Sequence, residues 1–369
     1  MNSDGPDQIS GAPIPALPRA RLIGRFVAIG VVILGTAVLF AYAGGWLTPH
    51  GLTPARIVNS FELVSGGPHP GFRRNHAKGV SVSGYFDSNG QGAALCKASI
   101  FLPGRVAIIG RFSVPGGKPY AADASTPVRG LAVRFQLPNG EEWRTAMINL
   151  PVFPVRTPGA FNEQLLVTTP DPATGKPDPA KMQAFLAKYP ESAKAIQLIR
   201  QLKPSGFENS TFNGLNAFRF INASGAMASV RWSMVPVQLF EPASATDPGP
   251  ANKNQLFDAL IASVHRKPVE WHLIITVAQP ADPTDDATIP WPPDRQHVDV
   301  GTLTIDAIES DDTGHARDIN FDPLILPDGI VASDDPILSA RSAVYSQSFT
   351  RREGEHKASS AVSTVEVGK

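Results

Sequence analysis

The chain has 369 residues, and 33 Lys and Arg balance 33 Asp and Glu, so its formal net charge is zero. This balance argues against nucleic acid as a partner, because domains that neutralise phosphates are usually clearly basic. The single cysteine, Cys96, excludes an internal disulfide framework and a thiolate metal cluster, and its apolar neighbours indicate a buried side chain.

The N-terminal segment predicts a membrane anchor. Residues 1–20 are polar and rich in proline, so we expect them to be disordered on the cytoplasmic side. An uncharged run follows from residue 26 to 47, and about 20 apolar residues suffice to cross a bilayer. Three arginines precede this run, which predicts a transmembrane helix over 21–47 with everything after it on the exported, periplasmic side. The alternative is a signal peptide cleaved after Ala43, which would also export the remainder.

We expect a tether over 48–65, one globular domain over 66–352 and a flexible tail over 353–369. Strand-like runs bounded by Gly and Pro dominate the first half of the domain, and their spacing suits an antiparallel barrel or sandwich. These runs are ALCKASIFL, RVAIIGRFSV and GLAVRFQL, which begin at residues 94, 105 and 130.

The second half of the domain mixes helices and strands, which predicts an α+β class. Apolar spacing indicates a helical stretch over 179–202 that Pro190 interrupts, and a second helix over 252–266. NAFRFINA and SVRWSMVPV read as a hairpin that turns at residues 222–225, and WHLIITVAQ reads as a further strand. The segment 280–295 is rich in Pro and Asp and is expected to be a loop.

Four short motifs carry residue types that can do chemistry, and each has an ordinary structural explanation when taken alone. Taken alone, His76 in RRNHAKG is explained as a surface histidine or as a core histidine with satisfied hydrogen bonds. Arg111 and Ser113 alternate with Phe112 on a strand, so they share one face, which meets either an anionic partner or water. Asn149 lies in NLPVF, and Arg341 and Tyr345 are four residues apart, as on one face of a helix.

Taken in order, the motifs resemble those of the catalase family. The matching pattern is R-x-x-H-A-x-G, R-F-S, N-x-P-x-F and F-D-P…L-P-x-G-I…R-x-x-x-Y, and the resemblance covers about residues 66–352. It implies a catalase-like antiparallel β-barrel core with flanking helices that enclose a haem, preceded here by one transmembrane helix.

The resemblance also implies a role for each motif residue. Tyr345 would bind the haem iron as a phenolate, with Arg341 one turn earlier donating to its oxygen. On the opposite haem face, His76 would be the acid and base for the peroxide, and Ser113 would fix its tautomer. Asn149 would orient the peroxide.

The remaining carried-over residues would hold the porphyrin. Phe161 matches the phenylalanine that covers the distal haem face. Arg73, Arg111 and Arg352 match the arginines that bind the haem propionates, for which a planar guanidinium is well suited.

This chain lacks the long arm and the C-terminal domain of full-size catalases, and it resembles the shorter catalase-related peroxidases with haem b. The resemblance therefore implies a peroxidase that reduces hydrogen peroxide, and also organic hydroperoxides, with small organic donors. We expect no NADPH and a monomer or small homo-oligomer. The alternatives are a true catalase, a lipid-hydroperoxide isomerase or dehydratase, and a haem-binding protein without catalytic activity.

Overall fold

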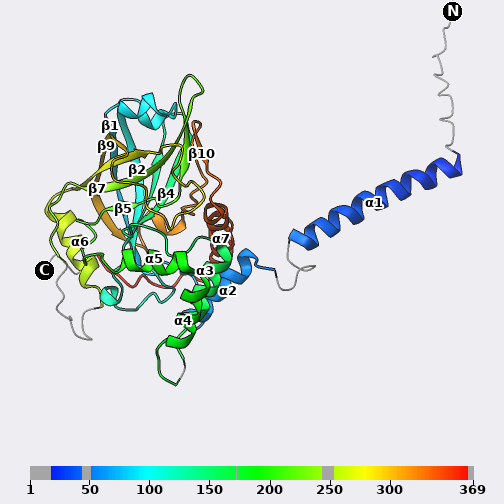
Figure 1. The fold of residues 1–369 in the computed structure, drawn as a ribbon, viewed down its shortest axis with the longest axis horizontal. Helices are drawn as coiled ribbons and strands as arrows, with labels where there is room; N and C mark the ends of the chain where they lie inside the picture. The colour runs from blue at the N-terminus through cyan, green and yellow to red at the C-terminus, as the bar shows by residue number, and fades with distance from the viewer. Residues whose placement is uncertain (1–17, 44–50, 172, 243–252, 365–369) are drawn as a thin grey trace, which may run out of the picture. The chain divides into compact units, whose positions relative to one another are not determined.

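The computed structural model describes residues 18–43, 51–171, 173–242 and 253–364, and the chain divides into two units (Figure 1). The first contains α1 (Arg19–Ala43), which is long and apolar enough to cross a membrane. The predicted span 21–47 therefore coincides with a helix as far as Ala43, and the rest of it lies outside the described residues. The second unit, Pro54–Lys369, carries the site and is described by itself.

The centre of the second unit is a closed antiparallel barrel of eight strands, in the order β7-β5-β4-β3-β2-β1-β9-β8, with β7 pairing back to β8. Two short strands, β6 and β10, extend the sheet beside β7. The predicted barrel is confirmed, as is the hairpin of β6 and β7. The strands are β1 (Gly79–Ser88), β2 (Gly104–Ser113), β3 (Gly130–Gln136), β4 (Glu142–Ile148), β5 (Phe212–Asn213), β6 (Phe218–Ile221), β7 (Met227–Pro236), β8 (Val269–Val277), β9 (Gln296–Ser310) and β10 (Ile330–Ala332).

Side-chain alternation fills the barrel with apolar residues and turns polar residues outward. On β2, Phe112 is fully buried in the main hydrophobic cluster together with Trp143 and Trp271. Because successive side chains of a strand point to opposite faces, Arg111 and Ser113 lie on the outer face of the barrel. The sequence did not determine whether the face that carries Arg111 and Ser113 meets an anionic partner or water. The structure places this face outside the barrel, but both residues are buried and do not face solvent.

The strand register brings the chemically interesting segments together at one end of the sheet. Ser113 pairs with Gly79 on one side and with Gly130 on the other, and Gly130 in turn pairs with Ile148. The loop that precedes β1, which contains His76, therefore lies directly beside the end of β2. Gly79, Ser113, Gly130 and Ile148 thus form one row across β1, β2, β3 and β4, and this row is the floor of the site.

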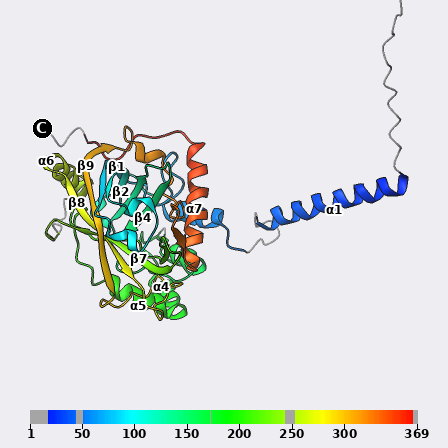
Figure 2. The same ribbon diagram turned by 90° about the horizontal axis from the view of Figure 1, so that it is seen from above.

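Helices cover the outer face of this sheet, and Figure 2 shows α7 running along the side of the barrel. Each of α3, α4, α5 and α7 begins with a proline in its first turn, and Thr157, Asp178 and Asp335 cap α3, α4 and α7 with their side chains. The helices are α2 (Pro54–Val64), α3 (Pro158–Val167), α4 (Pro179–Lys188), α5 (Pro190–Ile199), α6 (Gln255–Arg266) and α7 (Pro336–Glu353). The predicted break at Pro190 and the buried stripe of α6 are confirmed.

Three predictions about segments need correction. The tether predicted over 48–65 is a helix from residue 54 onward, α2, which packs against α3 and α7. The segment predicted as a strand over 94–102 is irregular, with the end of one 3-10 turn at Ala94 and a second turn over Ser99–Phe101; its buried side chains do alternate, at Cys96, Ala98 and Ile100, so the pattern resembled a strand. The tail predicted to be loose from residue 353 packs on the domain as far as residue 364, with Val362 only 1% exposed.

Candidate active site

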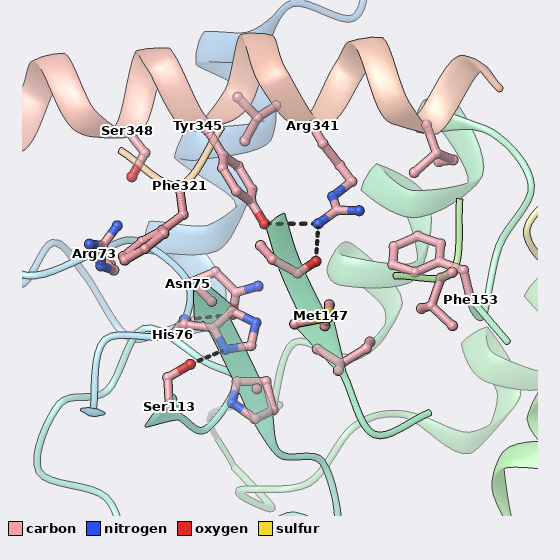
Figure 3. Close-up of a pocket in the computed structure, with 18 of the residues that line it drawn as sticks. Arg73, Asn75, His76, Ser113, Met147, Phe153, Phe321, Arg341, Tyr345 and Ser348 are labelled. Carbon is pink, nitrogen blue, oxygen red and sulfur yellow. Dashed lines mark hydrogen bonds between the residues drawn. The ribbon is translucent and has the colours of Figure 1, made fainter. Parts of the chain in front are cut away.

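A cavity of about 310 Å³, partly open to solvent, lies between the outer face of the barrel and helices α2, α3 and α7. Figure 3 shows Tyr345 and Arg341 entering it from α7, and His76 and Ser113 facing them from the barrel side. Most of the predicted site residues line this cavity, namely Arg73, His76, Arg111, Ser113, Phe161, Arg341, Tyr345 and Arg352. Asn149 is not among them.

On the α7 side, Arg341 is held in one orientation above the cavity. Its Nη1 donates to Asn216 Oδ1 at 2.5 Å, and its Nη2 donates to the Ala146 carbonyl at 2.8 Å. The same Nη2 lies 3.4 Å from the Tyr345 hydroxyl, one turn further along the helix. The guanidinium is thus fixed where it can donate to a phenolate oxygen at Tyr345.

Asn216 belongs to a strained corner that the sequence did not reveal as part of the site. Its amide Nδ2 donates to Asp335 Oδ2 at 2.7 Å, and its backbone N–H bonds the Gly214 carbonyl at 2.8 Å. This tight turn forces Leu215 to a φ of 64°, which is costly for a residue with a branched side chain. The corner links Asp335, the cap of α7, to Arg341, so it sets where the helix begins and where its arginine points.

On the barrel side, His76 is held through both its ring and its backbone. The ring Nδ1 lies 3.0 Å from Ser113 Oγ, and the backbone carbonyl accepts from Arg111 Nη1 at 2.8 Å. The backbone N–H of His76 donates to Asn75 Oδ1 at 3.0 Å, and its φ is 58°. A Cβ at Gly130 would lie 2.9 Å from Ser113 Oγ and 3.2 Å from the His76 ring, so the glycine leaves the room that this ring occupies.

The cavity keeps His76 neutral. Burial lowers its pKa to about 3, and the positive charges of Arg111, Arg73 and Arg341 act in the same direction. A neutral imidazole with one nitrogen held by Ser113 can accept a proton at its other nitrogen. The site therefore presents a base at neutral pH.

One end of the cavity carries more positive charge than the protein neutralises. Arg111 pairs with Asp311 at 2.7 Å, but the buried Arg352 has two nitrogens without a hydrogen-bond partner in the described part of the chain. Burial lowers the pKa of Arg73, and the neighbouring Arg352 and Arg111 lower it further. Burial also lowers the pKa of Arg352 to about 10. Unpaired buried cations are costly, so this end of the cavity fits an anionic group.

The rest of the wall is apolar. Phe161 on α3 packs against Phe61 of α2 and against Phe153, with ring centroids 5.8 Å apart in both pairs. The apolar wall would match a flat apolar group. The arginines at one end would match carboxylates at the edge of that group, and Tyr345 would match a metal that accepts a phenolate. The donor set thus fits a haem.

Asn149 is the predicted site residue that the structure does not bring to the cavity. Its Oδ1 accepts from the Arg129 backbone N–H at 2.8 Å, and its Nδ2 donates to the Pro127 carbonyl at 3.1 Å. Its neighbour Ile148 lines the cavity instead. These contacts use the amide oxygen and one of the two N–H donors of Nδ2, and the role of orienting the peroxide stays a prediction.

Comparison with known proteins agrees with this chemistry. The sequence model of the family described as "Catalase" matches residues 71–364. A catalase-related peroxidase of Synechococcus elongatus is 39% identical over 89% of this chain and 96% of its own length, and one of Mycolicibacterium paratuberculosis is 32% identical over 84% and 98%. Among solved structures, catalase A of Saccharomyces cerevisiae superposes with a TM-score of 0.70 at 20% identity, covering 77% of this chain and 61% of its own.

Proposed function

This chain belongs to the catalase family, and on that premise we propose that it binds haem b in the cavity beneath α7 and reduces hydrogen peroxide there with small organic donors. The relatives that it matches over nearly their whole length are named catalase-related peroxidases, which supports peroxide reduction as the activity. The observation that supports the assignment is the arrangement of a phenol, an imidazole and several arginines, one of them with unpartnered nitrogens, around one apolar cavity.

Each residue has a defined task in this proposal. Tyr345 supplies the phenolate ligand to the iron, and Arg341 donates to that oxygen. Arg73 and Arg352 would bind the carboxylates of the haem: Arg352 has two nitrogens without a hydrogen-bond partner among the described residues, and Arg73 is held at the cavity by the backbone carbonyls of Ala316, Arg317 and Ile319. Arg111, already paired with Asp311, fixes the His76 backbone and adds positive charge. The bound haem supplies the iron that accepts the peroxide and carries the electrons.

His76 moves the proton. Its neutral imidazole takes the proton from one oxygen of the peroxide and returns it to the oxygen that leaves as water. Ser113 keeps the ring nitrogen that faces the barrel engaged, so the nitrogen that faces the cavity remains the proton carrier. Phe161 and its aromatic neighbours exclude water from that space.

The test is an absorption spectrum of the purified chain with and without added haemin, followed by addition of peroxide. We expect stoichiometric haem uptake, and consumption of peroxide that accelerates when a phenolic donor is present. Steady release of oxygen without a donor would instead identify a true catalase. A colourless protein after incubation with haemin would refute the proposed function.

We also infer that α1 anchors the enzyme to a membrane with the second unit on the exported, periplasmic side. The support is the length and apolar character of α1 together with Arg19, Arg21 and Arg25 at its start. After fractionation, the anchored protein should remain in the membrane pellet through an alkaline carbonate wash. A soluble product that begins after Ala43 would show that the helix is a cleaved signal peptide.

A further inference from the structure

The floor of the cavity beside His76 is largely apolar. Ile148, Val128 and Leu131 line the cavity there. Peroxide bound beside His76 would therefore meet hydrocarbon on this side. Polar contacts to the peroxide, apart from those of His76 and the one predicted for Asn149, must come from elsewhere in the lining.

Asn75 is a polar side chain of the lining to which no role has been assigned. It directly precedes His76, both residues line the cavity, and Figure 3 shows their side chains next to each other. Its Oδ1 accepts two backbone hydrogen bonds, from the His76 N–H at 3.0 Å and from the Gly116 N–H at 2.7 Å. Two donors at one atom identify that atom as the oxygen, so the orientation of the amide is determined by its contacts.

This orientation leaves the Asn75 nitrogen as the free end of the amide. Within the described residues, Nδ2 donates to no protein acceptor, although an amide nitrogen carries two N–H donors. The Oδ1 contacts also fix the direction of Nδ2, because the amide is planar and both backbone donors are rigid. Asn75 therefore presents preorganised donors beside the imidazole.

We propose that Asn75 Nδ2 donates a hydrogen bond to the peroxide in the cavity and is a further polar contact of the substrate beside His76. The inference rests on the proposed function. As His76 takes the proton from one peroxide oxygen, negative charge develops on the peroxide. A fixed N–H donor in a water-poor site stabilises that charge more than it stabilises the neutral substrate.

Two substitutions separate this role from the structural role of the same amide. Asn75→Asp keeps an oxygen for the two backbone donors but replaces both N–H donors with an acceptor. Asn75→Leu has a similar size and removes both functions. We expect the second-order rate constant for hydrogen peroxide to fall about 10- to 100-fold in both variants, the range for a hydrogen bond to a charged group. Assays at pH 8 keep His76 neutral even if the new carboxylate raises its pKa.

Asn222→Asp is the matched control, because it makes the same chemical change at an amide whose oxygen also accepts two backbone N–H groups, from Ser224 and Ala226, but which does not line the cavity. We expect its rate constant to stay within about twofold of the unsubstituted protein. Thermal unfolding of the haem-free chain provides an independent readout, in which Asn75→Leu should unfold at a lower temperature than Asn75→Asp. The equilibrium affinity for cyanide, which accepts hydrogen bonds and is not reduced, should fall about tenfold in both Asn75 variants.

The outcomes are distinguishable. If Asn75→Asp keeps the original rate constant and cyanide affinity, the inference is wrong while the proposed function stands. If the unsubstituted chain takes up no haem, the proposed function fails and the inference fails with it.

Discussion

Ser113→Ala removes the contact that orients the proton-carrying imidazole. Ser113 is buried, and its Oγ lies 3.0 Å from His76 Nδ1. The backbone of His76 is fixed separately by Asn75 and Arg111, so the substitution frees the ring without releasing the loop. The change therefore isolates ring orientation and tautomer from the rest of the site.

The magnitude follows from the cost of one hydrogen bond. A neutral intramolecular bond contributes about 0.5–1.5 kcal/mol, and about 1.4 kcal/mol corresponds to a factor of ten. If the whole contribution of the Ser113 contact serves to position the ring, the rate constant for peroxide falls about 2- to 13-fold. His76→Ala removes the proton carrier itself and should lower the same constant by about 10²–10⁴.

The assay is stopped-flow measurement of peroxide consumption by the haem-loaded chain under pseudo-first-order conditions. Ser125→Ala is a suitable control, because Ser125 Oγ donates to the Ala122 carbonyl and lines no part of the cavity. An unchanged rate in Ser113→Ala would show that the ring needs no such support. A loss as deep as that of His76→Ala, in a protein with normal haem content, would show that Ser113 does more than orient.

Three further results are expected. Tyr345→Phe should release haem during gel filtration at least about tenfold faster, because the ligand oxygen is missing, and a normal ferric spectrum would contradict its assignment. Arg352→Met should stabilise the haem-free chain against urea by about 1–3 kcal/mol, since it removes a buried guanidinium with unpaired nitrogens, and should weaken haem retention; a less stable haem-free chain would contradict this. The pKa of His76 is lowered from 6.5 to about 3 by folding, so its contribution to stability is complete above pH 6.5 and is lost as the pH falls towards 3. In urea titrations between pH 6 and 4, the free energy of unfolding of the haem-free chain should fall by about 1.4 kcal/mol per pH unit relative to that of His76→Gln. If the two free energies change in parallel with pH, the pKa of His76 is not lowered by folding.

The sequence predicted the barrel and most of the cavity lining because the motifs are local and ordered along the chain. His76, Ser113 and Tyr345 come from three distant segments, yet each stands in a short pattern that fixes its residue type. What joins them is the register of β1, β2 and β3, which no single motif contains. The family resemblance supplied that long-range information.

The contacts of Asn149 could not be predicted from its motif. Ala146, Met147 and Ile148 at the end of β4 line the cavity, and Met147 also belongs to the barrel core. Asn149 follows this strand, and its amide bonds the backbone of the segment before β3. These contacts join separate segments of the chain, so no short motif contains them, and the peroxide-orienting role of Asn149 remains a prediction.

Helix α2 was missed for a different reason. Its buried residues Ile57, Val58 and Phe61 follow the spacing of a helix face, a signal present in the sequence but overlooked beside a long apolar run. Asn75 had no comparable signal, because its importance depends on the hydrogen bonds that orient its amide.

The position of α2 has a practical consequence for protein production. Ile57 and Phe61 form part of the cavity wall, although they follow the apolar helix by only a short stretch of chain. A shortened version intended for expression without α1 must therefore begin before Pro54, since a start at residue 66 would open the cavity to solvent. Proteolytic removal of everything up to Ala43 respects this boundary, so a processed form would keep its cavity wall intact.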